Sequence, residues 1–270
     1  MIGDGAETTY PDPARALIGT APLRFAATLL LIALVYGLSL WFVDFNLQRL
    51  WTGLPKLAHW AAKAWPPDLQ DIGVLTARAL ETVAMAVIGT TIGVLLAAPC
   101  CILAAQNLTP SPLLYTPMRW FLNALRGIDS FVFALLFVAA VGLGPFAGVL
   151  GVGLHSAGSI AKLWSEAIEA VEPGPLEAAA LTGANRLKVI SYALLPDVLP
   201  NLTSIALYVW EFNVRASTVL GVVGAGGIGQ ELKNSVDLLD FARLLTIILI
   251  ILAMVTVIDQ FSAWLRRRLV

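Results

Sequence analysis

Charged side chains are scarce in this sequence: they make up 13% of its 270 residues, whereas 58% are hydrophobic. Soluble domains usually carry about 25% charged residues, so the deficit argues against a soluble fold and predicts a membrane protein surrounded by lipid. The formal net charge is −1. Without a basic excess, the chain is not expected to bind nucleic acid.

Cysteine and histidine are also rare, with two of each. Cys100 and Cys101 are adjacent in an apolar run, and two thiols build neither a disulfide framework nor a four-ligand zinc site. They are expected to be packing residues, and His155 is expected to make a helix–helix hydrogen bond. We therefore predict no metal site and no cofactor in this chain. No nucleophile–base pair is recognisable, so an enzyme is not expected.

Long apolar runs make up much of the sequence. A spanning helix needs about 20 mostly apolar residues, and six segments meet or approach this length: 24–43, 80–104, 120–141, 146–164, 199–220 and 244–264. The sequence therefore predicts an all-α membrane protein of about six transmembrane helices, in a single domain over 23–265. The first run is long for a signal peptide and lacks a cleavage site after it, so it should remain as an anchor.

Basic residues indicate the orientation of these spans. Arg266, Arg267 and Arg268 follow the sixth segment directly and place the end 266–270 in the cytoplasm. Six spans then place the tail 1–22 there too, so both termini are expected to be cytoplasmic. The same count puts the polar stretch 165–190 on the cytoplasmic side.

One sizeable loop, residues 45–70, is expected on the outer side. Its apolar residues recur at helical spacing, and tryptophans such as Trp51 and Trp60 suit the membrane interface. We predict a short helix lying on the outer membrane surface.

The polar island between the fourth and fifth segments carries a specific spacing. Glu177-Ala178-Ala179 is followed by Gly183, and nine residues later by Ala193-Leu194-Leu195-Pro196. This resembles the EAA loop of ABC-transporter permeases, where the membrane subunit docks onto a separate ATPase; Ala193 replaces the usual isoleucine. The resemblance implies a cytoplasmic coupling helix over 177–183, with Leu195 and Pro196 completing the coupling residues. Gly183 would allow the sharp exit from that helix.

Charges within predicted spans are costly and are therefore functional hypotheses. Arg126 and Asp129 are expected to share one helical face of the third segment. Glu211 and Arg215 are four residues apart on the fifth, with Glu211 roughly 16 Å beyond Pro200 and so near the middle of the bilayer.

Two interpretations of these charges stay open. Each pair either neutralises itself and joins helices, or the arginines supply positive field to a polar path for an anion, since a guanidinium pairs well with oxyanions. The candidate path residues are Arg126, Asp129, Glu211, Asn213, Arg215, Ser217 and Thr218.

The glycine-rich stretch 224–229 satisfies the dinucleotide motif G-x-G-x-x-G. That site also needs a βαβ unit and an acidic residue about 20 positions further on, where this chain has Leu249, so nucleotide binding is rejected. The glycines instead predict a re-entrant or hairpin element over 217–240, on the outer side beside the path. An ordinary outer loop is the alternative. The glycines concerned are Gly224, Gly226, Gly227 and Gly229.

A longer stretch around these glycines indicates a narrower group within the ABC-transporter permeases. Residues 208–221 (YVWEFNVRASTVLG), with the following 222–232, resemble the permease subunit of phosphonate ABC importers, a family with relatives for phosphite and hypophosphite. Residues 123–129 (NALRGID) are similar to the N-x-x-R-S-I-P element of methionine- and phosphonate-type permeases, with Gly127 and Asp129 in place of serine and proline.

The resemblance, which covers about 75–265, implies a type I ABC importer permease fold in a bacterial inner membrane. It implies a second permease subunit (a copy or a close paralogue), two ABC ATPase subunits that bind ATP and magnesium, and a periplasmic substrate-binding protein. It also implies phosphonate-class oxyanions as solutes. The alternatives are a permease for another small solute such as an amino acid, an ATP-independent channel or secondary transporter, and an intramembrane enzyme.

Overall fold

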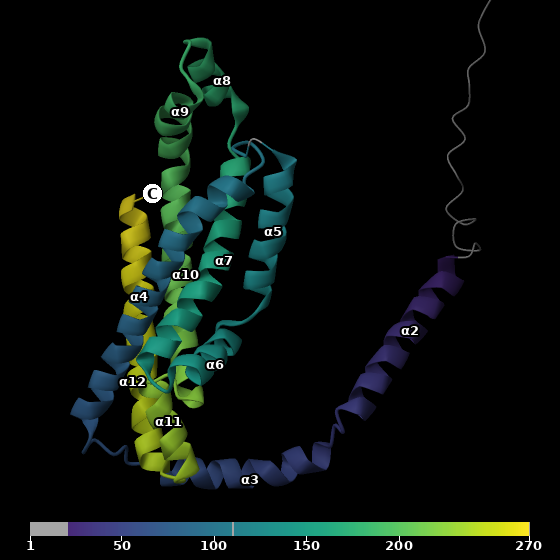
Figure 1. The fold of residues 1–270 in the computed structure, drawn as a ribbon. Coiled ribbons are helices and arrows are strands. Elements are labelled where there is room, and N and C mark those ends of the chain that lie inside the picture. Colours follow the sequence, from purple (N-terminus) through teal and green to yellow (C-terminus); the bar gives the residue numbers. More distant parts are fainter. Residues whose placement is uncertain (1–20, 110, 270) are drawn as a thin grey trace, which may run out of the picture. The chain divides into compact units, whose positions relative to one another are not determined.

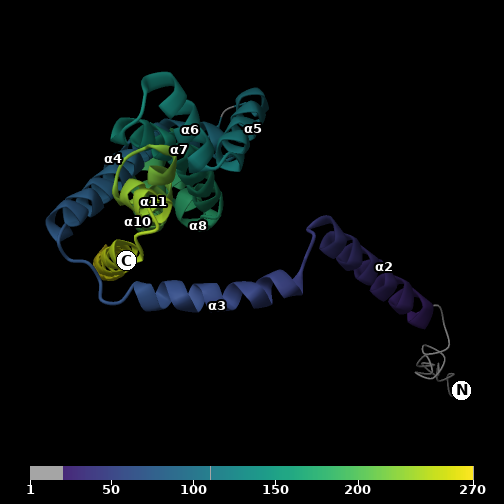
Figure 2. The same ribbon diagram turned by 90° about the horizontal axis from the view of Figure 1, so that it is seen from below.

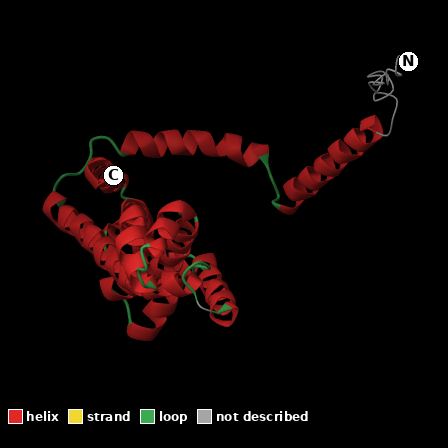
Figure 3. Cartoon of the chain, turned by 90° about the horizontal axis from the view of Figure 1, so that it is seen from above, coloured by secondary structure: helices red, strands yellow, loops and turns green. Residues whose placement is uncertain are grey.

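The computed structural model describes residues 21–109 and 111–269, and all regular elements in these ranges are helical (Figure 3). The predicted tail 1–22 therefore lies almost wholly outside the described residues. The long helices are α2 (Ala21–Phe42), α4 (Ile72–Ala104), α7 (Pro145–Glu169), α10 (Leu195–Leu220) and α12 (Phe241–Leu269). The shorter elements are α3 (Leu47–Lys63), α5 (Pro112–Gly127), α6 (Ser130–Val141), α8 (Pro173–Leu181), α9 (Arg186–Val189), the π-helix η1 (Ile190–Leu194), the 3-10 helix η2 (Gly221–Val223) and α11 (Ile228–Asp237).

By their contacts the described residues form two compact units, divided between His59 and Trp60. In the first unit, α2 is apolar on all sides, and none of the residues in its most apolar stretch is buried. This is expected of a helix surrounded by lipid. The helix predicted within 45–70 is confirmed as α3, which is amphipathic and has no buried residue. Its place on the outer membrane surface stays a prediction.

By length and apolar composition, five described helices could cross a membrane, and α5 with α6 would make a sixth. The predicted all-α class is thus confirmed, and five to six candidate spans agree with the prediction of about six. Several helices begin before the apolar runs that indicated them: α4 begins at Ile72 and α10 at Leu195. The fifth predicted span shows this best: it belongs to a continuous helical segment, Arg186–Val223, of 38 residues.

The predicted third span, 120–141, is wrong as a single helix. The α5 and α6 axes differ by 85°, with the break at Ile128 and Asp129. Asp129 has an extended backbone and its carboxylate accepts a hydrogen bond from the Phe131 amide at 2.9 Å, so it caps the start of α6. Aspartate is a favoured N-cap, and it begins a new helix here. Arg126 lies in the last turn of α5, so these two charges do not share a helical face.

The second unit is built around α7, against which α4, α5, α6 and α10 pack (Figure 1, Figure 2). Small residues allow this close approach. A Cβ on Gly151 would stand 2.7 Å from the Ala134 backbone nitrogen of α6, and one on Gly93 of α4 would stand 2.6 Å from Ser156 Cβ. Helices in membranes associate through such backbone proximity, because lipid supplies no hydrophobic drive between them.

The two ends of this bundle carry different elements. The short helices α8 and α9 lie at one end, which we call the α8 end, and α11 lies at the opposite end (Figure 1). Helices α4, α7 and α12 run toward the α8 end, while α5 and α10 run away from it (Figure 1). The C-terminal arginines of α12 therefore point toward the end that carries α8.

We expect Gly151→Ala to destabilise the bundle, because its methyl group would meet the α6 backbone, which cannot move aside like a flexible side chain. Overpacking of this kind costs about 1–3 kcal/mol. Gly73→Ala on α4 is the matched control, since a Cβ there would meet nothing within 4 Å. Thermal unfolding of the purified protein in detergent measures both; equal midpoints would contradict the tight α6–α7 contact.

Candidate functional site

The short helix α8 carries the Glu177 motif and has no buried residue. Glu177 and Ala178 are exposed, and Leu181 in its last turn is 88% exposed. The helix ends at Leu181 with Thr182 as its C-cap, and Gly183 has a φ of +80° and donates its N–H to the Ala180 carbonyl at 3.0 Å. Glycine adopts this left-handed conformation without strain, so the sequence correctly indicated a sharp turn at Gly183.

Leu195 and Pro196 open α10, directly after η1. Both are exposed. The structure therefore presents Glu177 to Gly183 on one short helix and its exit, and the remaining motif residues at the start of the next long helix.

A cluster of four charged residues joins α10 to α12. Arg215 donates to both Asp259 carboxylate oxygens, at 2.9 and 3.1 Å, and to Glu211 at 3.2 Å. Glu211 also accepts from Arg266 at 2.9 Å. Two guanidinium groups thus face two carboxylates, and the cluster has no net charge. The Glu211–Arg215 pair was foreseen from the sequence; its partners on α12 were not.

A sequence signal for the missing partners existed. Asp259 is the one acidic residue within the sixth apolar segment, and Arg266 follows it by seven residues, two helical turns along the same face. The pattern could have indicated a charged stripe on α12, although not the helix that it contacts.

The predicted depth of Glu211, near the middle of the bilayer, stays a prediction. The helix start from which that depth was counted is wrong. The count began at Pro200, but α10 starts at Leu195 and continues from η1 without interruption. Proline is tolerated in the first turns of a helix, so it did not mark the start.

Asn213 and Ser217, also path candidates, have fully buried side chains. The Asn213 amide donates to Thr90 on α4 at 2.8 Å and to Ser156 on α7 at 2.7 Å. This buried junction ties three helices together. In the structure these two residues face the interior of the bundle, while Thr218 binds the Arg215 carbonyl at 2.7 Å.

Arg126 and Asp129 are exposed at the α5–α6 break, apart from the α10–α12 cluster. Among the residues in 21–109 and 111–269, neither takes part in an ion pair. The break exposes the Ile128 carbonyl, which bonds His155 Nδ1 of α7 at 2.8 Å. The expected helix–helix hydrogen bond of His155 is thereby confirmed.

The glycine-rich stretch forms a helical hairpin, α10–η2–α11. Gly224, Gly226 and Gly227 have φ values of +86°, +79° and +71°, which glycine alone adopts readily. A Cβ on Gly229 would overlap the Thr218 carbonyl, so the two arms meet backbone to backbone. The hairpin is confirmed; its position on the outer side stays a prediction.

Hydrogen bonds and ion pairs hold this hairpin to the neighbouring helices. The Gly224 carbonyl accepts from the Gly144 amide of the α6–α7 turn at 2.9 Å, and the Ile228 amide donates to Thr82 of α4 at 2.9 Å. Glu231 of α11 pairs with Arg243 of α12 at 3.0 Å. The hairpin is thus fastened to α4, α12 and the α6–α7 turn at the end of the bundle opposite α8.

The chain belongs to the family of binding-protein-dependent transport system inner membrane components, whose model matches residues 75–270. It is therefore a multi-pass permease of the inner membrane and not an enzyme. Membership in this family implies a substrate-binding protein and an ATPase as partners.

Three curated relatives match 76% to 90% of the chain. HtxC of Stutzerimonas stutzeri, named for phosphite transport, is 49% identical over 90% of this chain and 86% of its own length. The phosphite transport system permease protein PtxC of the same organism is 42% identical over 87% of each chain. The phosphate-import permease protein PhnE of Mycolicibacterium smegmatis is 42% identical over 76% of this chain and 39% of its own length.

Among solved structures, an inward-facing MetNI methionine ABC transporter matches with a TM-score of 0.67 and 21% identity. The match covers 75% of this chain and 99% of that one. The predicted ABC importer permease fold is confirmed.

Proposed function

We propose that this chain is the membrane permease of an ATP-driven importer for phosphite or phosphonate-class oxyanions. The observation that carries the proposal is its 49% and 42% identity to HtxC and PtxC, whose names specify phosphite transport. Relatives named for D-methionine in Vibrio cholerae and arginine in Corynebacterium glutamicum are 25% and 27% identical, which makes an amino acid the weaker candidate.

Reconstitution with the copurifying ATPase and binding protein tests the substrate. We expect ATP-dependent uptake of phosphite, hypophosphite or a phosphonate into vesicles, since these share the small oxyanion group that a guanidinium recognises. Competition among these solutes, phosphate and methionine ranks them. Uptake without ATP would favour a channel or secondary transporter, and methionine as the only imported solute would overturn the oxyanion assignment.

We further propose that Glu177, Ala178, Ala179 and Gly183, with Leu195 and Pro196, receive the movement of the ATPase. The exposure of α8 supports this, because a surface helix with no buried residue is free to seat in a partner's groove. The α8 end would then face the cytoplasm, together with the C-terminal arginines of α12. Two ATPases, a second permease and a periplasmic binding protein complete the proposed assembly.

Gly183→Val should abolish uptake while the protein remains in the membrane, because a β-branched residue does not tolerate a φ of +80° and α8 would change direction. Gly174→Ala at the start of the same helix is the control, since a Cβ there meets nothing within 4 Å. Uptake and membrane content are measured together. Wild-type uptake by the Gly183 variant would remove α8 from the coupling role.

We propose that the anion passes near Arg215, while Glu211 and Asp259 moderate its attraction. Arg215 and Asp259 each expose 41% of their side chains, and Glu211 exposes 13%. A path must attract its solute without retaining it, and a guanidinium already shared by two carboxylates meets that condition. The glycine hairpin, Gly224 to Gly229, follows the nearby C-terminal end of the same helix and is the proposed gate.

Arg215→Ala should lower uptake about tenfold, the loss expected when a charge-assisted hydrogen bond to the solute is removed. Asp259→Asn separates this role from helix joining, since it also breaks the Arg215–Asp259 ion pair between α10 and α12 but leaves the positive charge of Arg215. Uptake and the amount of assembled complex are measured for both variants. Equal loss of uptake and assembly in the two would reduce Arg215 to a structural residue.

A further inference from the structure

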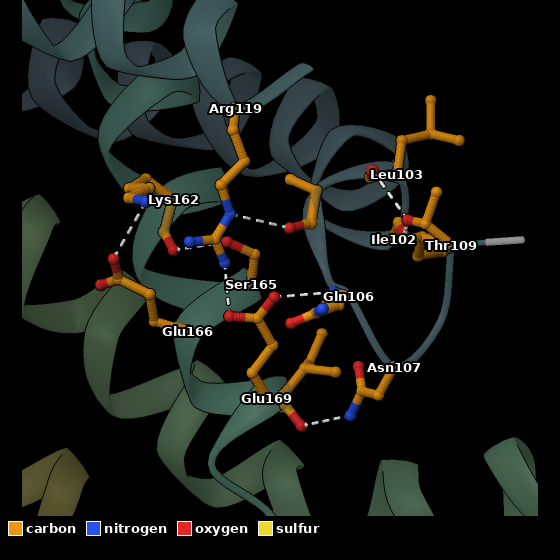
Figure 4. Close-up of polar contacts among 12 residues, drawn as sticks. Ile102, Leu103, Gln106, Asn107, Thr109, Arg119, Lys162, Ser165, Glu166 and Glu169 are labelled. Carbon is orange, nitrogen blue, oxygen red and sulfur yellow. Dashed lines mark hydrogen bonds and ion pairs between the residues drawn. The ribbon is translucent and has the colours of Figure 1, made fainter. Parts of the chain in front are cut away.

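The loop that follows α4, residues 105–109, is bonded to α7 at the α8 end of the bundle (Figure 4). Glu169, in the last turn of α7, accepts a hydrogen bond from the Gln106 amide at 2.7 Å, and its other carboxylate oxygen pairs with Arg119 of α5. The Asn107 side chain donates to the Ile168 carbonyl at 2.8 Å. Glu169 therefore joins α7, α5 and this loop at one point.

Arg186, which follows α8 in the chain as Glu169 precedes it, binds the same loop. This first residue of α9 donates to the carbonyls of Asn107 and Leu108, at 3.2 and 2.7 Å. The segment that contains α8, residues 170–185, thus has both of its ends bonded to one loop. Arg119 completes the arrangement by donating to the carbonyl of Ala104, the last residue of α4, at 3.1 Å.

Helix α8 itself is held weakly, since it has no buried residue and packs against α9 and η1. Through the covalent chain alone, a displacement of α8 would be transmitted to α7, which precedes it, and to α9 and α10, which follow it. The bonds of Glu169 and Arg186 extend its reach to α4 and α5. Each of these bonds involves a charged group, and such bonds are stronger than those between neutral groups.

We propose that Glu169 and Arg186 are positioning residues that fasten residues 105–109 to both ends of the coupling helix. A displacement of α8 then moves the ends of α4, α5, α7 and α9 as one body. The proposal rests on the function proposed above, in which α8 receives the ATPase movement. A rigid connection transmits a displacement to the spans, whereas a loosened one absorbs it while the ATPase continues to turn over.

The test uses the complete reconstituted transporter with Glu169→Gln and Arg186→Met. The first keeps an acceptor for the Gln106 amide but loses the charge that holds Arg119; the second keeps an apolar stem and loses both donors. We expect about fivefold fewer solute molecules imported per ATP in each variant, with binding-protein-stimulated hydrolysis within about twofold of wild type.

Two variants serve as matched controls. Glu166→Gln removes a carboxylate one turn away, whose partner Lys162, at 3.1 Å, lies on the same helix and links no second element (Figure 4). Lys188→Met removes a positive charge two residues from Arg186; Lys188 is exposed and forms no ion pair among the described residues. Both should keep the wild-type number of solutes per ATP.

Amide hydrogen exchange of the purified chain gives a readout that needs no solute. Glu169→Gln should speed exchange at residues 105–109 about tenfold, because local opening becomes easier when the ion pair is lost, and Glu166→Gln should leave it unchanged. Absence of solute import by the wild-type transporter would contradict the proposed substrate, and the exchange measurement would still test Glu169. Unchanged solute per ATP in both variants, or a parallel loss of hydrolysis, import and assembled complex, would overturn the proposal for Glu169 and Arg186.

Discussion

Close contact between α7 and its neighbours is the constraint on which the rest of the bundle depends. Gly151 brings α7 against the backbone of α6, and Gly93 of α4 brings that helix against Ser156 of α7. Contacts this short leave little room for α7 to slide or turn. Its last turn carries Glu169 and leads into α8, so this packing fixes the point from which the exposed helix leaves the bundle.

Charge pairing is the second organising feature. The arginines that join helices in the second unit, such as Arg119, Arg215 and Arg243, each contact a carboxylate from another helix. An isolated charge in or near a membrane is costly, whereas a pair with satisfied hydrogen bonds costs less. Arg119 lies at the α8 end and Arg243 near α11, whereas Arg215 is two residues from Asn213, whose junction uses neutral groups. The helices are therefore joined by ion pairs, neutral hydrogen bonds and close contacts of small residues.

The break between α5 and α6 shows how one residue redirects the chain. Asp129 caps α6 instead of extending α5, and the Ile128 carbonyl freed by the break is taken by His155 of α7. In the related element NxxRSIP, proline occupies the place of Asp129, and proline also ends a helix. The departure from the family pattern thus preserves a helix boundary by a different physical means.

The sequence by itself determined the helical class, the approximate number of spans, the exposed motif helix with its turn at Gly183, and the hairpin at Gly224 to Gly229. All of these follow from apolar run length or from local backbone preference. Tertiary structure alone decided that α12 supplies the partners of Glu211 and Arg215, and that Asn213 is buried. It also decided that Glu169 and Arg186 bind the same loop. Periodicity shows which residues share a helical face, but it does not show which helix that face meets.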